Sequence, residues 1–330
     1  MFIFRMSICS RVNKEQRMNQ ALRNIQSAVV TGPTGAVGAA LCRRLLAEGI
    51  RVYAVVRPGS ARLTALPQSA LLRAVPCDLA EMSRLPALLL PASADAFYHL
   101  AWQGTTGAAR NDADAQLANV RYALDAARAA KTLGCQVFIG AGSQAEYGRA
   151  EGVLTADTPA FPENGYGMAK LCAGQLTRLE CGRLGLAHIW VRILSVYGPY
   201  DGMQSMISSV TAKLLRGEKP ALTAGNQLWD YLYADDAADA LFRCAVSGKD
   251  RAVYPLGSGR AMPLRRYVEM LRDAIDPALP LGFGELPYAP RQVMHLEADI
   301  RLLAQDTGFV PRIPFEKGIQ NTMDWMKTVL

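Results

Sequence analysis

The feature that most constrains the fold is a glycine-rich turn between a short apolar run and a helical pattern. The segment VVTGPTGAVGAALCRRLLAEG, residues 29–49, carries glycines at positions 32, 35 and 38. In such a turn the first glycine permits the tight bend, the second permits close backbone approach, and the third lets the helix pack on the strand. Backbone N–H groups at a helix N-terminus then favour an anionic diphosphate. A glycine triplet alone also fits a plain tight turn, but its place at the head of a βαβ unit predicts a dinucleotide-binding site.

Strand and helix patterns alternate along residues 26–196. Such alternation predicts parallel strands with helices on both faces of the sheet. We expect strands at 27–32, 51–57, 71–79, 95–102, 136–143 and 187–198, and helices at 36–48, 112–133 and 166–182. The expected fold class is therefore α/β, with a Rossmann-type doubly wound parallel sheet.

The pattern changes after Gly198, where helices dominate, with helical spacing at 206–216, 235–247, 263–275 and 315–327. We therefore divide the chain into a basic tail (1–25), a dinucleotide-binding domain (26–196) and a smaller, mostly helical substrate lobe (197–330). Part of 227–257 is expected to return to the Rossmann-type domain. Open α/β sheets bind ligands in a crevice at the C-terminal ends of their strands, so we expect the site there.

Charge and cysteine usage exclude several classes of function. Residues 1–25 hold five basic side chains against one acidic one, more than half of the net charge of +7. The remaining surface is nearly balanced, so nucleic acid is not an expected partner. The seven cysteines and three histidines show no metal-ligand spacing, and an odd cysteine count indicates reduced thiols in the cytoplasm. No apolar run is long enough for a membrane helix.

The choice of dinucleotide is predicted by the end of the second expected strand. NAD sites place an acidic residue there to hold the ribose 2′-hydroxyl, whereas an arginine accommodates a 2′-phosphate. This chain has Arg57 at that place. NADP(H) is therefore favoured and NAD(H) is the alternative, because Arg57 could also simply point to solvent. Asp78, after the third strand, is placed to reach the adenine.

A tyrosine, a lysine and a serine are the candidate catalytic groups. Tyr166 and Lys170 lie one turn apart on a predicted helix, and Ser143 ends the fifth predicted strand. A tyrosine is a poor acid or base at neutral pH unless a nearby cation favours its phenolate. The lysine could supply that cation, while Ser143 holds the substrate oxygen and Tyr166 moves the proton.

These motifs together resemble an extended short-chain dehydrogenase/reductase of the nucleotide-sugar epimerase, dehydratase and reductase family. The similarity runs from about residue 26 to 327 and rests on TGPTGAVG, CDL (77–79), HLAW (99–102), GAGSQAEYG (140–148), NGYGMAK (164–170), VRILSVYGP (191–199) and YLYADDAADAL (231–241). The resemblance implies a homodimer, with Ser143, Tyr166 and Lys170 as catalytic residues. It also implies a cofactor site that contains Gly32, Thr34, Gly35, Ala36, Val37, Gly38, Arg57, Asp78, Leu79, Leu100, Ala101, Tyr166 and Lys170.

The sequence departs from the family pattern where substrate chemistry is decided. Relatives that are 4,6-dehydratases carry an Asp-Glu pair after the catalytic Ser or Thr, whereas this chain has Gln144 and Ala145. Neither can exchange a proton, so 4,6-dehydration is disfavoured. Glu146 comes one position late, and alternation along an extended segment predicts that it points to the other face.

Three substrate contacts of the family, two of which hold the substrate diphosphate, are also altered. Ser195 replaces an asparagine, Trp229 replaces an arginine, and Arg291 is displaced by two positions from the expected arginine. We therefore expect substrate contacts from Trp102, Gln103, Gln144, Arg192, Ser195 and Arg291, although Arg192 could equally form a structural salt bridge. For His99 a core position is favoured.

We therefore expect an NADP(H)-linked oxidoreductase acting at C4 of a nucleotide-activated sugar, with Tyr166 as the proton-transfer group. A 4-keto reductase is favoured, because epimerases of the family usually retain NAD. The alternatives are a nucleotide-sugar 4-epimerase with tightly held NAD and, from another class, a dinucleotide-sensing binding protein. Relatives of that last class lose the tyrosine or lysine that this chain keeps.

Overall fold

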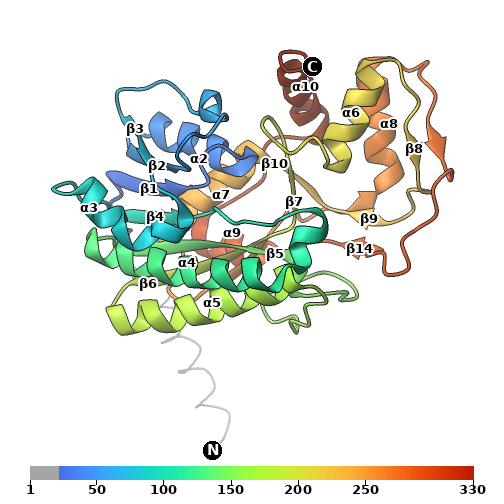
Figure 1. Cartoon of the computed structure of the whole chain (residues 1–330). Helices are drawn as coiled ribbons and strands as arrows, with labels where there is room; N and C mark the ends of the chain where they lie inside the picture. Colours follow the sequence, from blue (N-terminus) through green and yellow to red (C-terminus); the bar gives the residue numbers. More distant parts are fainter. Residues whose placement is uncertain (1–21) are drawn as a thin grey trace, which may run out of the picture.

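A seven-stranded, fully parallel sheet forms the centre of the molecule (Figure 1). The computed structural model describes residues 22–330. The strand order is β11-β6-β5-β4-β1-β2-β3. The strands are β1 (Ser27–Thr31), β2 (Arg51–Val56), β3 (Leu72–Pro76), β4 (Ala96–His99), β5 (Val137–Ser143), β6 (Ala187–Ile193) and β11 (Val253–Leu256). This arrangement confirms the predicted α/β class with a doubly wound parallel sheet.

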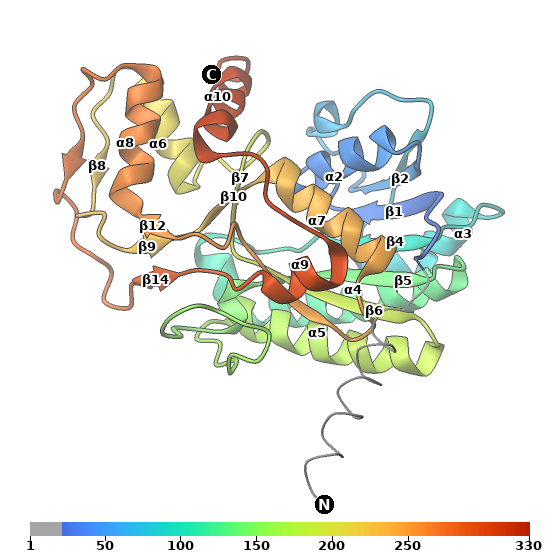
Figure 2. The same ribbon diagram turned by 180° about the vertical axis from the view of Figure 1, so that it is seen from behind.

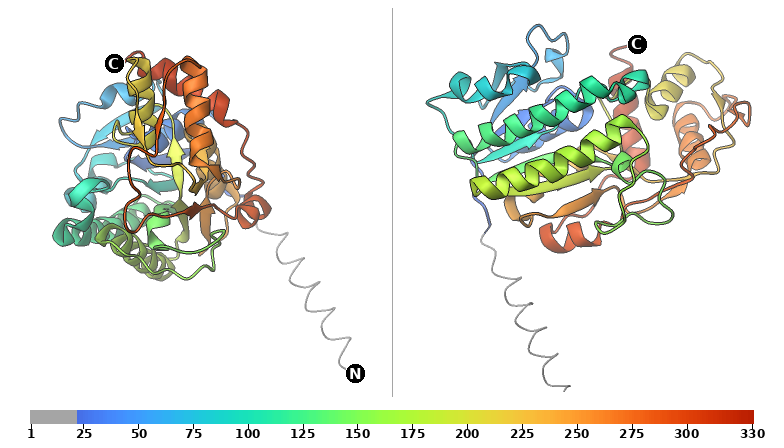
Figure 3. Two further views of the ribbon diagram at one scale, coloured as in Figure 1. Left: turned by 90° about the vertical axis from the view of Figure 1, so that its right-hand side faces the viewer. Right: turned by 60° about the horizontal axis from the view of Figure 1, so that its bottom comes forward.

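Helices cover both faces of this sheet. On one face α4 (Ala113–Thr132) and α5 (Gly165–Leu184) lie side by side, as the right-hand view of Figure 3 shows. On the other face lie α2 (Ala36–Ala47) and α7 (Ala234–Ser247), which pack on each other, with α9 (Arg301–Thr307) against α7. A separate apolar core fills the space between the sheet and each helical layer. Burial of the apolar side chains in these two cores stabilises the folded domain through the hydrophobic effect.

Short elements complete this part of the chain. They are α3 (Leu85–Leu89) and four 3-10 helices, η1 (Leu63–Ala65), η2 (Leu79–Arg84), η3 (Gly107–Asn111) and η4 (Gln144–Glu146). The last two follow β4 and β5, at the carboxyl edge of the sheet where the expected site lies.

The C-terminal part of the chain forms a smaller lobe beside the carboxyl edge of the sheet (Figure 2). Its helices α6 (Met206–Leu215), α8 (Leu264–Ile275) and α10 (Phe315–Met326) surround an aromatic core that includes Tyr197, Tyr267 and Phe315. Two-residue strands form two small sheets, β12-β9-β14 and β13-β8. These strands are β8 (Ala221–Leu222), β9 (Leu228–Trp229), β12 (Met262–Pro263), β13 (Gly282–Phe283) and β14 (His295–Leu296).

The predicted strand at 187–198 is in fact two strands. β6 ends at Ile193, and β7 (Ser195–Tyr197) pairs instead with β10 (Tyr231–Tyr233) in a separate two-stranded sheet. The break comes after Leu194, whose amide still donates to Leu256 at the sheet edge. The apolar residues continue across the break, so the sequence pattern does not show that the two strands pair in different sheets, and it predicted one strand.

The N-terminal boundary lies earlier than predicted. The Arg23 guanidinium donates to the carbonyl oxygens of Ala245 and Gly248 at 3.1 and 2.9 Å, which anchors it to the end of α7. Ile25 is buried in the core beside α7. The ordered body therefore includes residues assigned to the 1–25 tail, of which residues 1–21 lie outside the described part. Among the helices of residues 22–330, none combines the length and the apolar character needed to cross a bilayer.

Candidate active site

The glycine turn after β1 has the geometry of a diphosphate cradle. Gly32 adopts a φ of +68°, and a Cβ atom there would lie 2.9 Å from the amide nitrogen of Ala101. A Cβ on Gly38 would lie 2.1 Å from the Gly32 carbonyl oxygen, so α2 packs tightly on the turn. By contrast, a Cβ on Gly35 would meet nothing closer than 3.9 Å. The second glycine therefore keeps open space above the turn.

The first turn of α2 faces this space with unused donors. Gly35 is its N-cap, and no side chain caps the helix or places an acid in its first turn. The N–H groups of Ala36 and Val37 therefore remain for an anion, which the helix dipole also attracts. These residues fit the diphosphate of a dinucleotide.

Thr31, which sequence reasoning missed, ties the glycine turn to the end of β4. Its hydroxyl accepts from the amides of Leu100 and Ala101 at 3.1 and 3.2 Å. The same hydroxyl lies 3.2 Å from Nδ1 of His99. Burial lowers the pKa of His99 to about 3, so this histidine is neutral and belongs to the core, as expected.

The two residues expected at the adenosine end lie after β2 and β3. Arg57 is exposed and directly follows β2. Within residues 22–330, its guanidinium has no hydrogen-bond or ion-pair partner. Asp78 caps η2 by accepting from Ala80 at 3.0 Å, and Leu79 follows it against the core. Thr34 is half-buried in the glycine turn.

Tyr166, Ser143 and Lys170 converge as expected. Asn164 caps α5 and thereby fixes its first turn, which carries Tyr166. The Ser143 hydroxyl at the end of β5 accepts from the Ala145 amide at 3.2 Å, and it lowers the pKa of the Tyr166 phenol. The Lys170 amine lies 5.8 Å from the centre of the Tyr166 ring.

Burial shifts the pKa of both titratable groups toward their neutral forms. It raises the pKa of the Tyr166 phenol, while the Ser143 hydroxyl and the Arg110 guanidinium oppose that rise. Burial lowers the pKa of Lys170 to about 7, with Glu146 opposing. Lys170 is therefore only partly protonated at neutral pH, whereas the Tyr166 phenol keeps its proton.

Glu146 and Arg192 pair with each other inside the protein. Glu146 is fully buried, because η4 turns the chain and breaks the alternation of an extended segment. Its carboxylate accepts from the Ser143 amide at 2.8 Å, from Trp190 Nε1 at 3.0 Å and from Arg192 Nε at 2.7 Å. Arg192 also stacks on Tyr147. The prediction that Arg192 contacts substrate is therefore wrong, and its alternative, a structural ion pair, is what the chain forms.

The other expected substrate contacts divide into two groups. Trp102 and Ser195 have partners within the protein: Trp102 Nε1 donates to Gln116 at 2.9 Å, and Ser195 accepts from Trp229 at 2.8 Å. The side chains of Gln103, Gln144 and Arg291 have no hydrogen-bond partner within residues 22–330. Gln103 and Arg291 are exposed, and Gln144 is half-buried in η4.

The loop that carries Trp102 and Gln103 is held by two buried amides of α4. The Asn119 side chain accepts from the Gln103 amide and donates to its carbonyl, both at 2.9 Å. Gln116, which the sequence did not reveal, donates to the carbonyls of Gly104 and Ala109 at 2.9 and 3.0 Å. Both side chains are almost fully buried. The loop is therefore fixed relative to α4.

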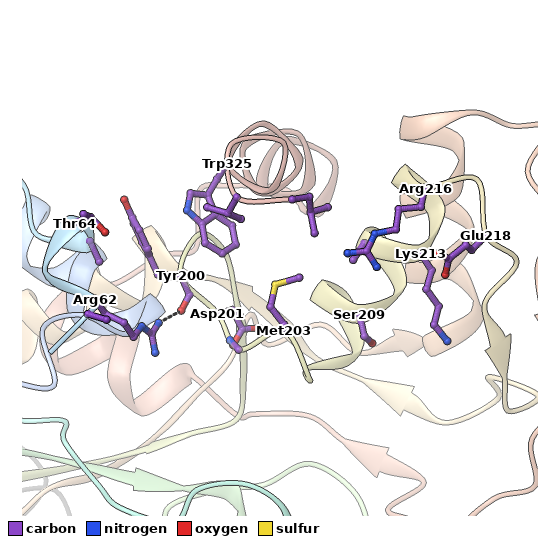
Figure 4. Close-up of a pocket in the computed structure, with 16 residues that line it drawn as sticks. Arg62, Thr64, Tyr200, Asp201, Met203, Ser209, Lys213, Arg216, Glu218 and Trp325 are labelled. Atoms are coloured by element: carbon purple, nitrogen blue, oxygen red, sulfur yellow. Dashed lines mark hydrogen bonds between the residues drawn. The ribbon is translucent and has the colours of Figure 1, made fainter.

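A cavity of about 820 Å³ opens between the two lobes (Figure 4). Arg62 lies on its Rossmann-type side and donates to the Tyr200 carbonyl at 2.6 Å. On the other side Lys213 projects from α6 and Arg216 from the residue that directly follows this helix, and Trp325 comes from α10. None of these cations appeared in the sequence prediction, because no motif marks them.

A smaller cavity of about 340 Å³ lies within the C-terminal lobe. Trp229, Tyr231 and Gln227 line it, and Lys213 lines both cavities. Gln227 is only 4% exposed, and its Oε1 atom has no hydrogen-bond partner. A buried acceptor without a partner is costly unless a ligand satisfies it. No group of three or more metal-ligating side chains occurs within residues 22–330.

Comparison with known proteins gives a consistent picture. The model of the NAD dependent epimerase/dehydratase family matches residues 28–257. The chain is 27% identical over 186 residues to the dTDP-glucose 4,6-dehydratase of Xanthomonas campestris pv. campestris. This aligned region covers 54% of this chain and 53% of that protein. The chain thus spans about half the length of the first curated relatives it matches.

Solved structures resemble the chain over nearly its whole length. MoeE5 in complex with UDP-glucuronic acid and NAD is 27% identical with a TM-score of 0.80, covering 92% of this chain and 100% of that one. The UDP-glucose 4-epimerase of Thermotoga maritima with UDP-glucose has a TM-score of 0.81 at 22% identity, covering 92% of this chain and 99% of that one. The second likeness is one of fold.

Proposed function

We propose that this chain, which belongs to the NAD dependent epimerase/dehydratase family, is an NADP(H)-linked oxidoreductase acting at C4 of a nucleotide-activated sugar. The family resemblance inferred from the motifs is thereby confirmed. The reaction that we propose is the reduction of a 4-keto sugar. The observation that carries this proposal is the convergence of the Tyr166 phenol, the Ser143 hydroxyl and the buried Lys170 amine at the carboxyl edge of the sheet.

The glycine turn would hold the dinucleotide by its diphosphate, through the N–H groups of Ala36 and Val37. When bound, this cofactor supplies the hydride. Preference for NADP(H) is supported by Arg57, because the described end of β2 offers a cation and no carboxylate. The family description names NAD, so NAD(H) remains the alternative that the experiment below separates.

The proton is handled by the chain's own residues. The Ser143 hydroxyl accepts from the Ala145 amide through its oxygen, and when substrate is bound it would donate its hydrogen to the substrate oxygen. Burial raises the pKa of Tyr166, and the phenol is therefore protonated at neutral pH. It can donate this proton to the oxygen at C4 while Ser143 keeps that oxygen in place.

The smaller cavity is our candidate for the nucleoside. The unpartnered Gln227 oxygen would accept an N–H of the base, and Trp229 and Tyr231 would contact its ring. Lys213, at the border of the two cavities, would then face the diphosphate. With Arg192 engaged by Glu146, Lys213 replaces it as the proposed diphosphate contact.

A nucleotide-sugar 4-epimerase is the second candidate. It is favoured by the family description, which names epimerases and NAD, and NAD is also present in the structure of MoeE5 with UDP-glucuronic acid. The same tyrosine would first take the proton from the C4 hydroxyl and later return it. The expected lack of net cofactor consumption distinguishes this reaction from reduction.

The test combines cofactor identification with a substrate panel. Native mass spectrometry of the purified protein reads any retained cofactor and its phosphate count. The protein is then incubated with UDP-, CDP-, GDP- and dTDP-linked sugars and 4-keto sugars, with Tyr166→Phe as the control. Reduction predicts consumption of one NADPH per 4-keto sugar. Interconversion of two 4-hydroxy sugars without net NADPH consumption would instead establish the epimerase, and turnover unaffected by Tyr166→Phe would contradict both.

A further inference from the structure

An arginine that belongs to no recognised motif stacks on the candidate catalytic tyrosine. The Arg110 guanidinium carbon lies 4.4 Å from the centre of the Tyr166 ring. Arg110 comes from η3, and its Nη1 donates to the Thr105 carbonyl at 3.0 Å. Trp102 contacts the same ring edge-on, with the ring centroids 6.2 Å apart. The phenol ring thus lies against a cation and an indole, both from the loop after β4.

Hydrogen bonds and close packing of its neighbours fix the segment that carries Arg110. Gln116 holds the neighbouring Ala109 carbonyl at 3.0 Å, and the Asn111 side chain accepts from the Gly165 amide at 3.0 Å. A Cβ atom on Gly165 would lie 3.0 Å from the Arg110 carbonyl oxygen. The segment that carries Arg110 is therefore in close contact with the residue that precedes Tyr166.

Three charged side chains and one hydroxyl face Tyr166, each from a different element. Ser143 at the end of β5 and Arg110 on η3 favour the phenolate, whereas Glu146 on η4 disfavours it. Lys170 on α5 lies 5.8 Å from the ring centre, and its amine donates to the Ala141 carbonyl at 2.6 Å. Its pKa is lowered to about 7 by burial, so it loses charge at neutral pH and above. An arginine keeps its charge throughout this range.

We propose that Arg110 is a positioning residue, whose guanidinium orients the Tyr166 ring and supplies the permanent positive charge that stabilises its phenolate. This inference rests on the proposed function, in which Tyr166 transfers the proton. Arg110 would thus be a second cation beside Tyr166, in addition to Lys170 one helical turn away. A cation over an aromatic face also favours one ring orientation.

The test measures the ionisation of Tyr166 directly, without any substrate. Protein labelled with ¹³C-tyrosine is titrated by NMR, and Tyr166→Phe identifies the resonance. In Arg110→Gln the phenolate loses its cation, so the pKa of Tyr166 should rise. Arg110→Lys keeps the charge and should return the pKa toward the native value. Arg121→Gln, which removes an exposed arginine from α4, is the matched control and should leave it unchanged.

Circular dichroism and the melting temperature establish that each variant is folded. A native Tyr166 pKa in folded Arg110→Gln would overturn the inference, as would an Arg110→Lys value as high as that of Arg110→Gln. Once a substrate is found, the rising limb of the pH profile for alcohol oxidation should move to higher pH in Arg110→Gln. Because the NMR titration needs no turnover, an Arg110 effect together with an inactive substrate panel would contradict the proposed function and leave this inference standing.

Discussion

The Nζ atom of Lys170 lies 2.6 Å from the main-chain carbonyl oxygen of Ala141. This hydrogen bond joins α5, which carries Tyr166, to β5, which ends at Ser143. The same amine lies 3.9 Å from the centre of the Trp102 ring. One buried amine therefore connects the three segments that surround the reacting atoms.

Titration of Lys170 should make stability depend on pH. Burial lowers its pKa from 10.5 to about 7, so between these values the unfolded chain binds the proton more than the native chain does. The free energy of unfolding should therefore rise with pH across this window through this group. Lys170→Met removes the titration. The melting temperature of Lys170→Met minus that of the native protein should be higher at pH 7 than at pH 10. A difference that does not change with pH would contradict the lowered pKa of Lys170.

Tyr166→Phe should abolish most turnover and leave the cofactor site intact. The substitution removes only the hydroxyl, and general acid–base groups typically contribute about 10²–10⁴-fold. Turnover of an identified substrate should fall by that order, while the dissociation constant of NADPH, measured by fluorescence, should stay close to native. Tyr122→Phe, at a half-buried position on α4, is the control. Near-native turnover in Tyr166→Phe would assign the proton to another group.

Arg57→Asp should reverse the cofactor preference. The native chain should bind NADPH more tightly than NADH, because Arg57 offers a cation to a 2′-phosphate. The aspartate should weaken NADPH binding and strengthen NADH binding. Arg51→Asp, at the exposed other end of β2, should change neither. Equal or tighter NADH binding by the native protein would refute the preference.

Glu146→Gln should be strongly destabilising. The substitution leaves Arg192 buried without its counter-charge, and breaking a buried pair typically costs about 3–5 kcal/mol. Glu163→Gln is the comparison, because it breaks the exposed pair with Arg149 and should cost far less than loss of the buried pair. Urea unfolding of both variants gives the two free energies. A similar small loss for both would show that Glu146 is dispensable for stability.

The chain should not dehydrate dTDP-glucose, despite its likeness to dehydratases of that substrate. η4 presents Gln144 and Ala145, which cannot exchange protons, and its one carboxylate, Glu146, is held by Arg192 and Trp190. Incubation should give no 4-keto-6-deoxy sugar, whereas a known dehydratase assayed in parallel should. Formation of that sugar at turnover rates would place an acid and a base elsewhere in the site.

The parts predicted correctly from the sequence are those set by local pattern. Residue spacing indicated strands β1 to β5, the glycine turn and the Tyr166–Lys170 pair, because each depends on neighbours within a few positions. Arg110 and Gln116 were missed because their contacts join η3 and α4 to other segments. Glu146 was misplaced because its direction depends on a turn that the apolar pattern does not show. For Arg192 the sequence left substrate contact and an ion pair open, because its partner lies 46 positions away.

The return of the chain to the first domain limits how this protein can be divided. β11 pairs with β6 as the edge strand, and α7 covers α2, yet both come from beyond residue 230. A gene fragment that stops at residue 196 would lack the strand beside Trp190 and the helix over Leu41. Modular exchange of the cofactor-binding part between relatives therefore requires three crossover points, one after β6 and one on each side of the segment that holds α7 and β11.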